Sequence, residues 1–525
     1  MAPLVCAVDV GTGSARAGIL DRQGRLVGRA THPIPISRPQ RDFAEHDSEA
    51  IWRAVCVAVR EACRKAGIDG NAVRGIGFDA TCSLVVRDGQ GAPLALSPDD
   101  AQCWDTIAWL DHRAHAEADE CTRSGHAVLD TAGGVMSPEM QIPKLVWLKR
   151  NLPSIWEKAG YFFDLTDFLS WKASGSAVRS QCTLACKWTY LAHEEGWQPD
   201  FLARMGIPDL IERGRLPLHA SPPGAFVGTL LPEAAQALGL SRECRVGAGL
   251  IDAYAGMLGV LGGLAGDGQA ERSLALIGGT SSCLMAMTRE PRCFPGVWGP
   301  YFGAVLPGLW VSEGGQSATG ALLDHVIRWH GAGGEPGREM HERIAARIQA
   351  LRSEEGSSFA GRLHVLPDFH GNRSPLADPH ALGVVSGLAL DSSFDSLCRL
   401  YWRTAVAIAL GIRHILDAQN GKGYAADTLY VTGGHARNAL LMELYADATG
   451  CTVVEPASED ATLLGTGMVA ATAAGLYPDL ASAAAGMGRK GRELGPDPRT
   501  RQAFDRDYRI FLEMQRQRQA LDRME

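Results

Sequence analysis

The sequence predicts an α/β protein made of two large domains, and three observations support this. With 525 residues, the chain is too long for one ordinary hydrophobic core. Residues 5–14 and 274–282 each read as a buried strand that runs into a tight turn containing Gly and Thr. Around both segments, apolar runs of strand length alternate with longer stretches of helical spacing. We expect the two domains to comprise residues 1–257 and 258–525.

The first domain begins with a strand, a turn and a returning strand. Residues 4–10 predict the strand, residues 11–13 the turn and residues 15–20 the return. Residues 48–66 carry apolar side chains at helical spacing and stop at Gly67, a typical helix end. Two further strands are expected at residues 73–79 and 83–87.

The second domain repeats this order. The expected elements are a strand at 274–277, a return at 281–287, a long apolar helix at 400–416, a strand at 428–432, a helix from about 437 to 448 before Gly450, a strand at 451–454 and a small-residue helix at 461–474. Residues 331–360 are expected to be a surface insertion. The strongly charged residues 485–525 predict a peripheral helix.

Composition excludes several classes of protein. The net charge is −8 with no basic stripe, which argues against nucleic-acid binding. Thirteen cysteines without a Cys-x-x-Cys pair are typical of buried reduced thiols and argue against a zinc site. The most apolar stretch, residues 249–266, contains Asp252 and several glycines, so we expect no membrane span. Without a signal-like start, we expect a cytoplasmic protein.

The two Gly-Thr turns are the first candidates for chemistry. Such a turn exposes backbone N–H groups and a hydroxyl, which suit a phosphate oxygen. The first turn contains Gly11, Thr12 and Gly13, and the second contains Thr280. One turn in each half indicates a nucleotide held between two related domains.

Asp9 ends the first strand immediately before the first turn. A carboxylate there could hold Mg²⁺ beside phosphates. The alternative is a turn residue that caps its own loop. Because Thr12, Arg16 and the second turn accompany it, we favour the functional interpretation.

Asp252 is a lone acid among apolar and small residues at an expected helix start. One interpretation is an N-cap. The other is a general base for a substrate hydroxyl, which would need the open space that flanking glycines provide. The spacing alone leaves both open.

Other polar residues stand in similarly ambiguous positions. Asp111 and Arg113 could begin a helix with a surface ion pair, or Asp111 could grip sugar hydroxyls. Lys187 could extend to the surface, and Glu313 could lie in a solvated loop. The segment 433–438, Gly-Gly-His-Ala-Arg-Asn, follows a strand and permits close approach of a ligand, although any α/β protein can have such a turn.

Taken in order, six segments resemble the FGGY family of carbohydrate kinases over residues 4 to about 480. They are 9–16, 109–113, 249–252, 277–280, 313–318 and 432–438. The resemblance implies an actin-like, ribonuclease H-like fold of two domains, with ATP and Mg²⁺ in the cleft and the sugar deeper against the N-terminal domain. It also implies a small-molecule sugar substrate and is compatible with a homodimer, since dimers are common in the family.

The resemblance assigns roles residue by residue. It makes Asp252 the catalytic base and Asp9 the acid associated with Mg²⁺. The sugar contacts implied are Ala80, Asp111, Lys187, Asp252 and Glu313. The nucleotide contacts implied are Gly11, Thr12, Gly13, Arg16, Thr280, Gly320, Gly433, Gly434 and Asn438.

Within the family, residues 368–375 and 186–190 look like the ribulokinase and five-carbon-sugar kinase branch. Glycerol kinases have an Arg-Glu pair where this chain has Ala80 and Thr81. This difference argues against glycerol as the substrate. From the resemblance to the ribulokinase branch we expect phosphorylation of D-ribulose, with ribitol, L-ribulose and D-xylulose as alternatives. The other rivals are an ATPase without a sugar acceptor, a sugar sensor, and a kinase for a larger or modified sugar. Two departures from the family are Gly13, where many members have Thr, and Leu382, where many have Arg.

Overall fold

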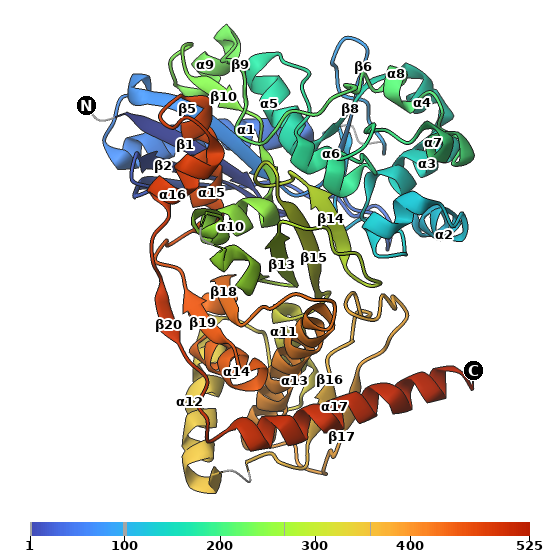
Figure 1. The fold of residues 1–525 in the computed structure, drawn as a ribbon, viewed down its shortest axis with the longest axis vertical. Coiled ribbons are helices and arrows are strands. Elements are labelled where there is room, and N and C mark those ends of the chain that lie inside the picture. Colours follow the sequence, from blue (N-terminus) through green and yellow to red (C-terminus); the bar gives the residue numbers. More distant parts are fainter. Residues whose placement is uncertain (1–2, 98–101, 267, 357–358, 525) are drawn as a thin grey trace.

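A computed structural model describes residues 3–97, 102–266, 268–356 and 359–524. The chain forms two mixed sheets of similar construction, one in each half of the molecule, with helices packed around them (Figure 1). This confirms the predicted two-domain α/β architecture.

The N-terminal sheet is built on a hairpin and a set of parallel strands. β1 pairs antiparallel with β2 and parallel with β5, and β10 and β11 also run parallel to β5. Every residue of β1 is buried, as expected for the middle of a sheet covered on both faces. In sheet order the strands are β3 (Leu26–Pro33), β2 (Ser14–Asp21), β1 (Leu4–Val10), β5 (Val73–Ala80), β10 (Arg245–Gly247) and β9 (Phe226–Thr229), with β11 (Leu250–Ile251) beside β5.

Helix α1 (Ser48–Ala66) covers β2 and β3 and has the predicted ends. Asp47 accepts a hydrogen bond from the Ala50 N–H at its start. Gly67 adopts a left-handed conformation, with φ of 65°, at its end.

A four-stranded sheet and short helices form a separate layer beside the N-terminal sheet. Its strands are β4 (Glu45–His46), β7 (Thr106–Ile107), β6 (Leu84–Asp88) and β8 (Ala159–Asp164). Its helices include α2 (His115–Arg123), α3 (Gln141–Asn151), α5 (Leu165–Ser174) and α6 (Gln181–Lys187). Figure 1 shows these helices grouped on one side of the N-terminal half.

The C-terminal sheet repeats the hairpin and parallel strands. β12 pairs antiparallel with β13 and parallel with β18, as β1 does with β2 and β5. Its order is β14 (Trp298–Phe302), β15 (Trp310–Gln316), β13 (Ser282–Thr288), β12 (Ser273–Gly278), β18 (Thr428–Gly433), β19 (Thr452–Glu455) and β20 (Arg492–Leu494). Its helices are α11 (Gly320–Trp329), α12 (Arg338–Glu355), α13 (Phe394–Asn420), α14 (Ala439–Thr449) and α17 (Arg501–Asp522). A short ribbon of β16 (His364–Leu366) and β17 (Val384–Ser386) lies nearby.

The chain then returns to the N-terminal half. Helices α15 (Ala461–Ala473) and α16 (Leu480–Met487) follow the C-terminal strands, yet α15 packs on β1, β5, β10 and α10 (Asp252–Leu261). A Cβ on Gly465 would lie 2.0 Å from the Ala255 carbonyl oxygen, so only glycine permits this close crossing. Helix α15, which lies late in the sequence, therefore completes the layer of helices on the N-terminal sheet (Figure 1).

Most predicted elements are confirmed, with shifted ends. The helix predicted at 400–416 is longer, at Phe394–Asn420, and the peripheral helix lies at Arg501–Asp522. The segment expected as a surface insertion contains α12, whose Ile344, Ile348 and Leu351 are buried in the C-terminal core.

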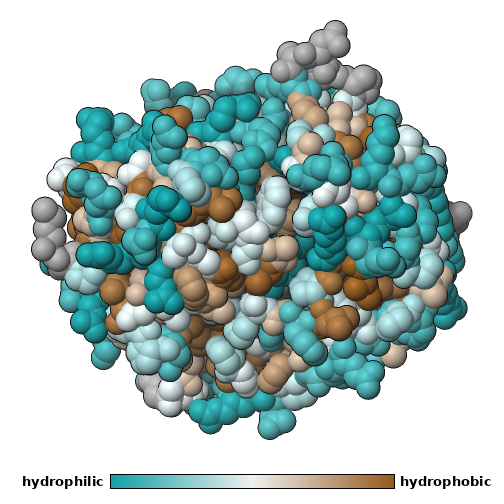
Figure 2. All heavy atoms as spheres, turned by 90° about the horizontal axis from the view of Figure 1, so that it is seen from above, coloured by the Kyte–Doolittle hydropathy of each residue, from teal (hydrophilic) through white to brown (hydrophobic). Residues whose placement is uncertain are grey.

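All thirteen cysteines are free, and all but Cys103, Cys283 and Cys293 are buried, as predicted. In the described ranges, no helix has the length and apolar character needed to cross a membrane. The face seen in Figure 2 is largely hydrophilic toward its edges, with scattered apolar patches between.

Candidate active site

Three carboxylates meet at one edge of the N-terminal sheet. Asp9 and Asp79 are register partners on β1 and β5, and Asp252 directly follows β11. Because parallel strands end at the same edge, the fold brings together acids far apart in the sequence. Ala80, the last residue of β5, is buried beside Ile251 at this edge.

Asp9 is fully buried and forms an ion pair with Arg16, its register partner on β2. Arg16 also lies 3.6 Å from Asp460, which pairs with Arg29 at 3.1 Å. Burial raises the pKa of Asp9 to about 7, although Arg16 opposes that rise. The turn-capping alternative for Asp9 gains no support, because no hydrogen bond joins its carboxylate to its own loop in the described residues.

Asp79 was not singled out in the sequence, yet it belongs to this group. Its Oδ2 accepts a hydrogen bond from the hydroxyl of Thr466 on α15. Its Oδ1 is buried without a hydrogen-bond partner among the described residues. Burial and the neighbouring charge of Asp9 raise the pKa of Asp79 well above its usual value. The available signal was an acid within the buried part of a strand, next to Phe78.

Asp252 is the first residue of α10, as predicted, but it is not the N-cap, which is Ile251. Its side chain is only partly buried, and Oδ1 accepts a hydrogen bond of 2.7 Å from the Ala253 N–H. Withdrawal from water raises the pKa of Asp252, and Ala253 and Arg16 offset part of that rise. A partly exposed carboxylate at a helix start is well placed to accept a proton from a bound hydroxyl.

The first Gly-Thr turn is held by two contacts. The Gly11 N–H donates to the Ser14 carbonyl at 3.1 Å, and the Trp109 indole N–H donates to the Thr12 hydroxyl at 2.9 Å. At Gly13 a Cβ would meet nothing within 4 Å, so the turn faces open space. The turn therefore has room for a ligand beside Asp9.

The second turn, Gly279-Thr280, is exposed and bound to the start of α11. The Gly279 carbonyl accepts the Gly320 N–H at 3.1 Å, and the Thr280 carbonyl accepts the Thr319 N–H at 2.9 Å. A Cβ on Gly320 would lie 2.6 Å from the Gly279 oxygen, which explains the glycine. The Gly279 N–H is used within the turn, where it donates to the Ser281 carbonyl at 2.8 Å, while Thr280 itself is exposed.

His435 is a second residue that sequence reasoning missed. Its Nε2 lies 3.1 Å from the Gly279 carbonyl, and its Nδ1 lies 2.8 Å from the Tyr445 hydroxyl. Because a carbonyl only accepts, Nε2–H donates to it and Nδ1 accepts from Tyr445. Burial lowers the pKa of His435 to about 4, consistent with this neutral form.

His435 thus joins the Gly279-Thr280 turn to the Gly433-Gly434 turn. Gly433 has φ of 79° and passes close to the Gly278 carbonyl. The Asn438 side chain caps α14 by accepting the Leu440 N–H at 3.1 Å.

Lys187 and Glu313 form a buried ion pair, with Nζ and Oε2 3.7 Å apart. The surface interpretation of Lys187 and the solvated-loop interpretation of Glu313 were both wrong. Burial alone would lower the pKa of Lys187, but Glu313 together with Cys82 and Tyr301 outweighs burial and raises it. Burial alone would raise the pKa of Glu313, but Lys187 and Arg373 together with hydrogen bonds lower it. Asp252 lies within electrostatic reach of both Lys187 and Glu313.

Asp111 is buried and paired with Arg113, so the pair does not lie on the surface and does not begin a helix; α2 begins at His115. Its Oδ2 also accepts the Ala44 N–H at 2.6 Å. Both carboxylate oxygens therefore already have protein partners.

The model of the N-terminal domain of the FGGY family of carbohydrate kinases matches residues 4–259, and the model of its C-terminal domain matches residues 274–474. The chain belongs to the FGGY family. It is therefore a carbohydrate kinase, and kinases of this family use ATP.

Relatives match nearly the whole chain. An FGGY carbohydrate kinase domain-containing protein of Danio rerio is 45% identical over 99% of this chain and 98% of its own length. A D-ribulokinase of Saccharomyces cerevisiae is 36% identical over 87% of this chain and 70% of its own length. The solved structure of a xylulose kinase from Rhodospirillum rubrum has a TM-score of 0.79 and 24% identity, covering 97% of this chain and 98% of that one, which confirms the fold.

Proposed function

We propose that this FGGY kinase transfers the γ-phosphoryl group of ATP to the terminal hydroxyl of D-ribulose, giving ADP and D-ribulose 5-phosphate. The observation that carries the proposal is the position of Asp252. Its carboxylate is partly exposed at the edge where Asp9 lies, and it is within electrostatic reach of the Lys187–Glu313 pair. The similarity to a yeast D-ribulokinase supports this choice of sugar.

In this reaction Asp252 accepts the proton of the terminal hydroxyl. As that O–H bond breaks, the oxygen bonds to the γ-phosphorus, and the bond to the β,γ-bridging oxygen breaks to release ADP. Gly11, Thr12, Gly13 and Arg16 on one side, and Thr280, Gly320, Gly433, Gly434 and Asn438 on the other, are proposed to hold the nucleotide. Ala80, Asp111, Lys187 and Glu313 are proposed to hold the sugar.

The residues fit a magnesium ion that accompanies ATP. Asp9 is an oxygen ligand of the kind Mg²⁺ prefers, and its Oδ1 makes no hydrogen bond to the described residues. Within those residues no three His, Cys, Asp or Glu side chains form a metal site, which suits an ion held by one carboxylate together with phosphates. Bound Mg²⁺ would neutralise charge on the phosphates.

The test is ADP release with Mg·ATP and D-ribulose, L-ribulose, D-xylulose, ribitol, glycerol or no acceptor. We expect D-ribulose to stimulate ADP release most. Preference for another five-carbon sugar or polyol would retain the kinase and replace its substrate. Equal ADP release in every sample would favour an ATPase, and binding without turnover would favour a sensor.

A further inference from the structure

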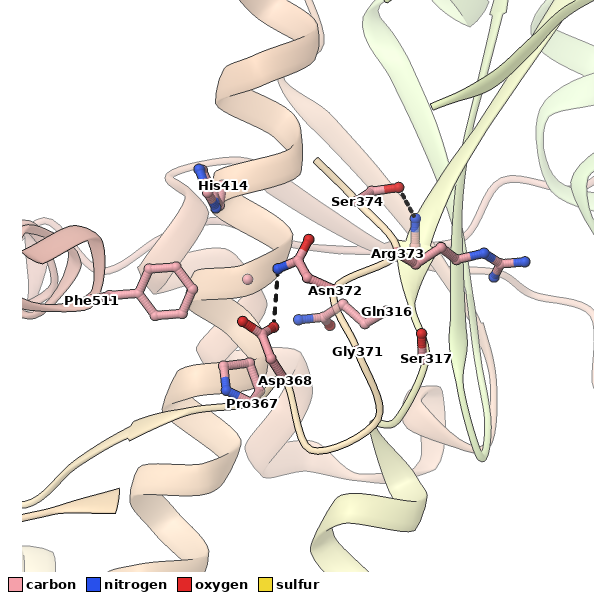
Figure 3. A pocket seen from close by; sticks show the side chains of 12 residues that line it. Gln316, Ser317, Pro367, Asp368, Gly371, Asn372, Arg373, Ser374, His414 and Phe511 are labelled. Atoms are coloured by element: carbon pink, nitrogen blue, oxygen red, sulfur yellow. Dashed lines mark hydrogen bonds between the residues drawn. The ribbon is translucent and has the colours of Figure 1, made fainter. Parts of the chain in front are cut away.

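The segment from Asp368 to Asp378 connects helix α17 to the proposed sugar site. Figure 3 shows a polar cleft, partly open to solvent, that this segment lines together with residues of β15, α13 and α17. Asp368 and Asn372 face each other in this cleft, and Phe511 of α17 lies beside them. The Arg373 side chain points in the direction opposite to Phe511.

Helix α17 fixes the two ends of this segment, Asp368 and Asp378. Gln515 Nε2 donates to Asp368 Oδ2 at 2.7 Å, and Asn372 Nδ2 donates to Asp368 Oδ1 at 3.0 Å. Arg518 lies 3.4 Å from Asp378, whose backbone exchanges two hydrogen bonds of 2.8 Å with Asn372. Both carboxylate oxygens of buried Asp368 are thereby satisfied, and one of the two donors belongs to α17.

Ser374, the residue after Arg373, is fixed by hydrogen bonds to other parts of the C-terminal half. The Ser374 hydroxyl accepts the Gly315 N–H at 3.2 Å and donates to the Gly296 carbonyl at 2.5 Å. Arg373 therefore lies between two residues whose positions are set, Asn372 by α17 and Ser374 by β15. Its backbone has little freedom to move.

The Arg373 side chain reaches the proposed sugar site and both halves of the chain. Its guanidinium donates to Glu313 at 3.2 Å and lies 3.6 Å from Glu139, which precedes α3. It also lies over the Trp298 ring at 4.3 Å, and Lys187 lies over the same ring at 4.3 Å. Two cations therefore share one aromatic ring and one carboxylate.

The distances separate the roles of the two cations. Lys187 is 3.7 Å from Glu313, an ion pair rather than a hydrogen bond. The hydrogen bonds that orient Glu313 come from Arg373 and Cys283 to Oε1 and from Tyr254 to Oε2. Arg373 supplies the charged one, and charge-assisted bonds are the stronger class.

We propose that Arg373 is a positioning residue of the sugar site, that it orients Glu313, and that α17 controls it by holding the Asp368–Asp378 segment. This inference rests on the proposed function. It links a peripheral helix to the affinity for sugar, without any contact between α17 and the sugar.

The experiment is a double-mutant cycle with Arg373→Gln and Gln515→Leu, in which KM is measured separately for D-ribulose and ATP. We expect Arg373→Gln to raise the KM for D-ribulose about tenfold or more, and Gln515→Leu about threefold, with the KM for ATP changed less than twofold. The double variant should match Arg373→Gln alone, because both changes act through Glu313. Arg373→Lys should restore part of the loss.

Two control variants make the same kinds of substitution at residues outside the proposed sugar site. Arg352 also pairs with a glutamate, Glu443, and lies over Trp402, so Arg352→Gln tests the loss of such an arginine. Gln517→Leu tests an exposed glutamine of the same helix. Both should leave the KM values unchanged.

An unchanged KM for D-ribulose in Arg373→Gln would overturn the role of Arg373. Effects that simply add in the double variant, or equal rises in both KM values, would overturn the link through α17. If the unsubstituted enzyme turns over none of the sugars, the proposed function itself fails, and this inference fails with it.

Discussion

Trp109 donates its indole N–H to the hydroxyl of Thr12, so a residue two positions before Asp111, a proposed sugar contact, is hydrogen-bonded to the first Gly-Thr turn. Trp109→Phe keeps the ring and removes this bond. We expect kcat/KM to fall about fivefold, corresponding to a net hydrogen bond of about 1 kcal/mol. Steady-state kinetics would measure this, with the thermal midpoint as the control for folding. An unchanged kcat/KM would show that Thr12 does not need this partner.

Replacing Asp252 with Asn should remove the proposed base while keeping the shape of the site. We expect kcat to fall by about a hundredfold to ten-thousandfold. Nucleotide binding, measured by calorimetry, should be retained, because Asp252 is not among the proposed nucleotide contacts. A kcat equal to that of the unsubstituted enzyme would exclude Asp252 as the base.

The pH dependence of kcat/KM should report the same carboxylate. Only ionised Asp252 can accept a proton, so kcat/KM should fall as the pH is lowered. Because burial raises its pKa from 3.8, the fall should begin at a higher pH than for an exposed aspartate. The comparison is a pH profile for the enzyme and for Asp252→Asn, in which the part of the fall caused by Asp252 should be absent, while any fall caused by Asp9, whose pKa burial raises to about 7, should remain.

His435 should matter for the nucleotide and not for the sugar. His435→Phe removes the N–H that holds the Gly279 carbonyl. We expect the KM for ATP to rise about fivefold, from the loss of about 1 kcal/mol, with little change in the KM for sugar. Tyr445→Phe, which removes only the second partner, should have a smaller effect. A larger change in the KM for sugar would contradict this assignment.

Asp164 should make the folded protein less stable as the pH rises. Burial and then the charge of Asp167 raise its pKa to about 8, whereas an unfolded aspartate titrates near 3.9. Between those values the folded state binds more protons, so the free energy of unfolding decreases with increasing pH. Asp164→Asn should flatten this slope and be more stable at pH 8 by at least about 1 kcal/mol. Denaturant titrations at pH 5 and pH 8 would measure the difference, and identical slopes would contradict it.

The sequence predicted the elements that depend on local signals. The strand–turn–strand units, the stop of α1 at Gly67 and the stop of α14 at Gly450 all follow from apolar spacing and from glycines with positive φ. Asp252 at a helix start was likewise predicted from its neighbours.

What the sequence could not show are relationships between distant residues. Asp79 is a single acid near the end of a mostly buried strand, and only the pairing of β5 with β1 places it beside Asp9. Lys187 and Glu313 each looked isolated because each has its partner in the other half of the chain. Helix α15 is buried on nearly every side, so no apolar stripe indicated the sheet that it covers.

That position of α15 affects how the protein is made. During synthesis, β1 and β5 leave the ribosome long before the helix that packs on them. The face of β1 and β5 on which α15 packs stays uncovered until residue 473 has emerged. The N-terminal half is therefore expected to depend on chaperones, or to remain loosely packed, until translation is almost complete.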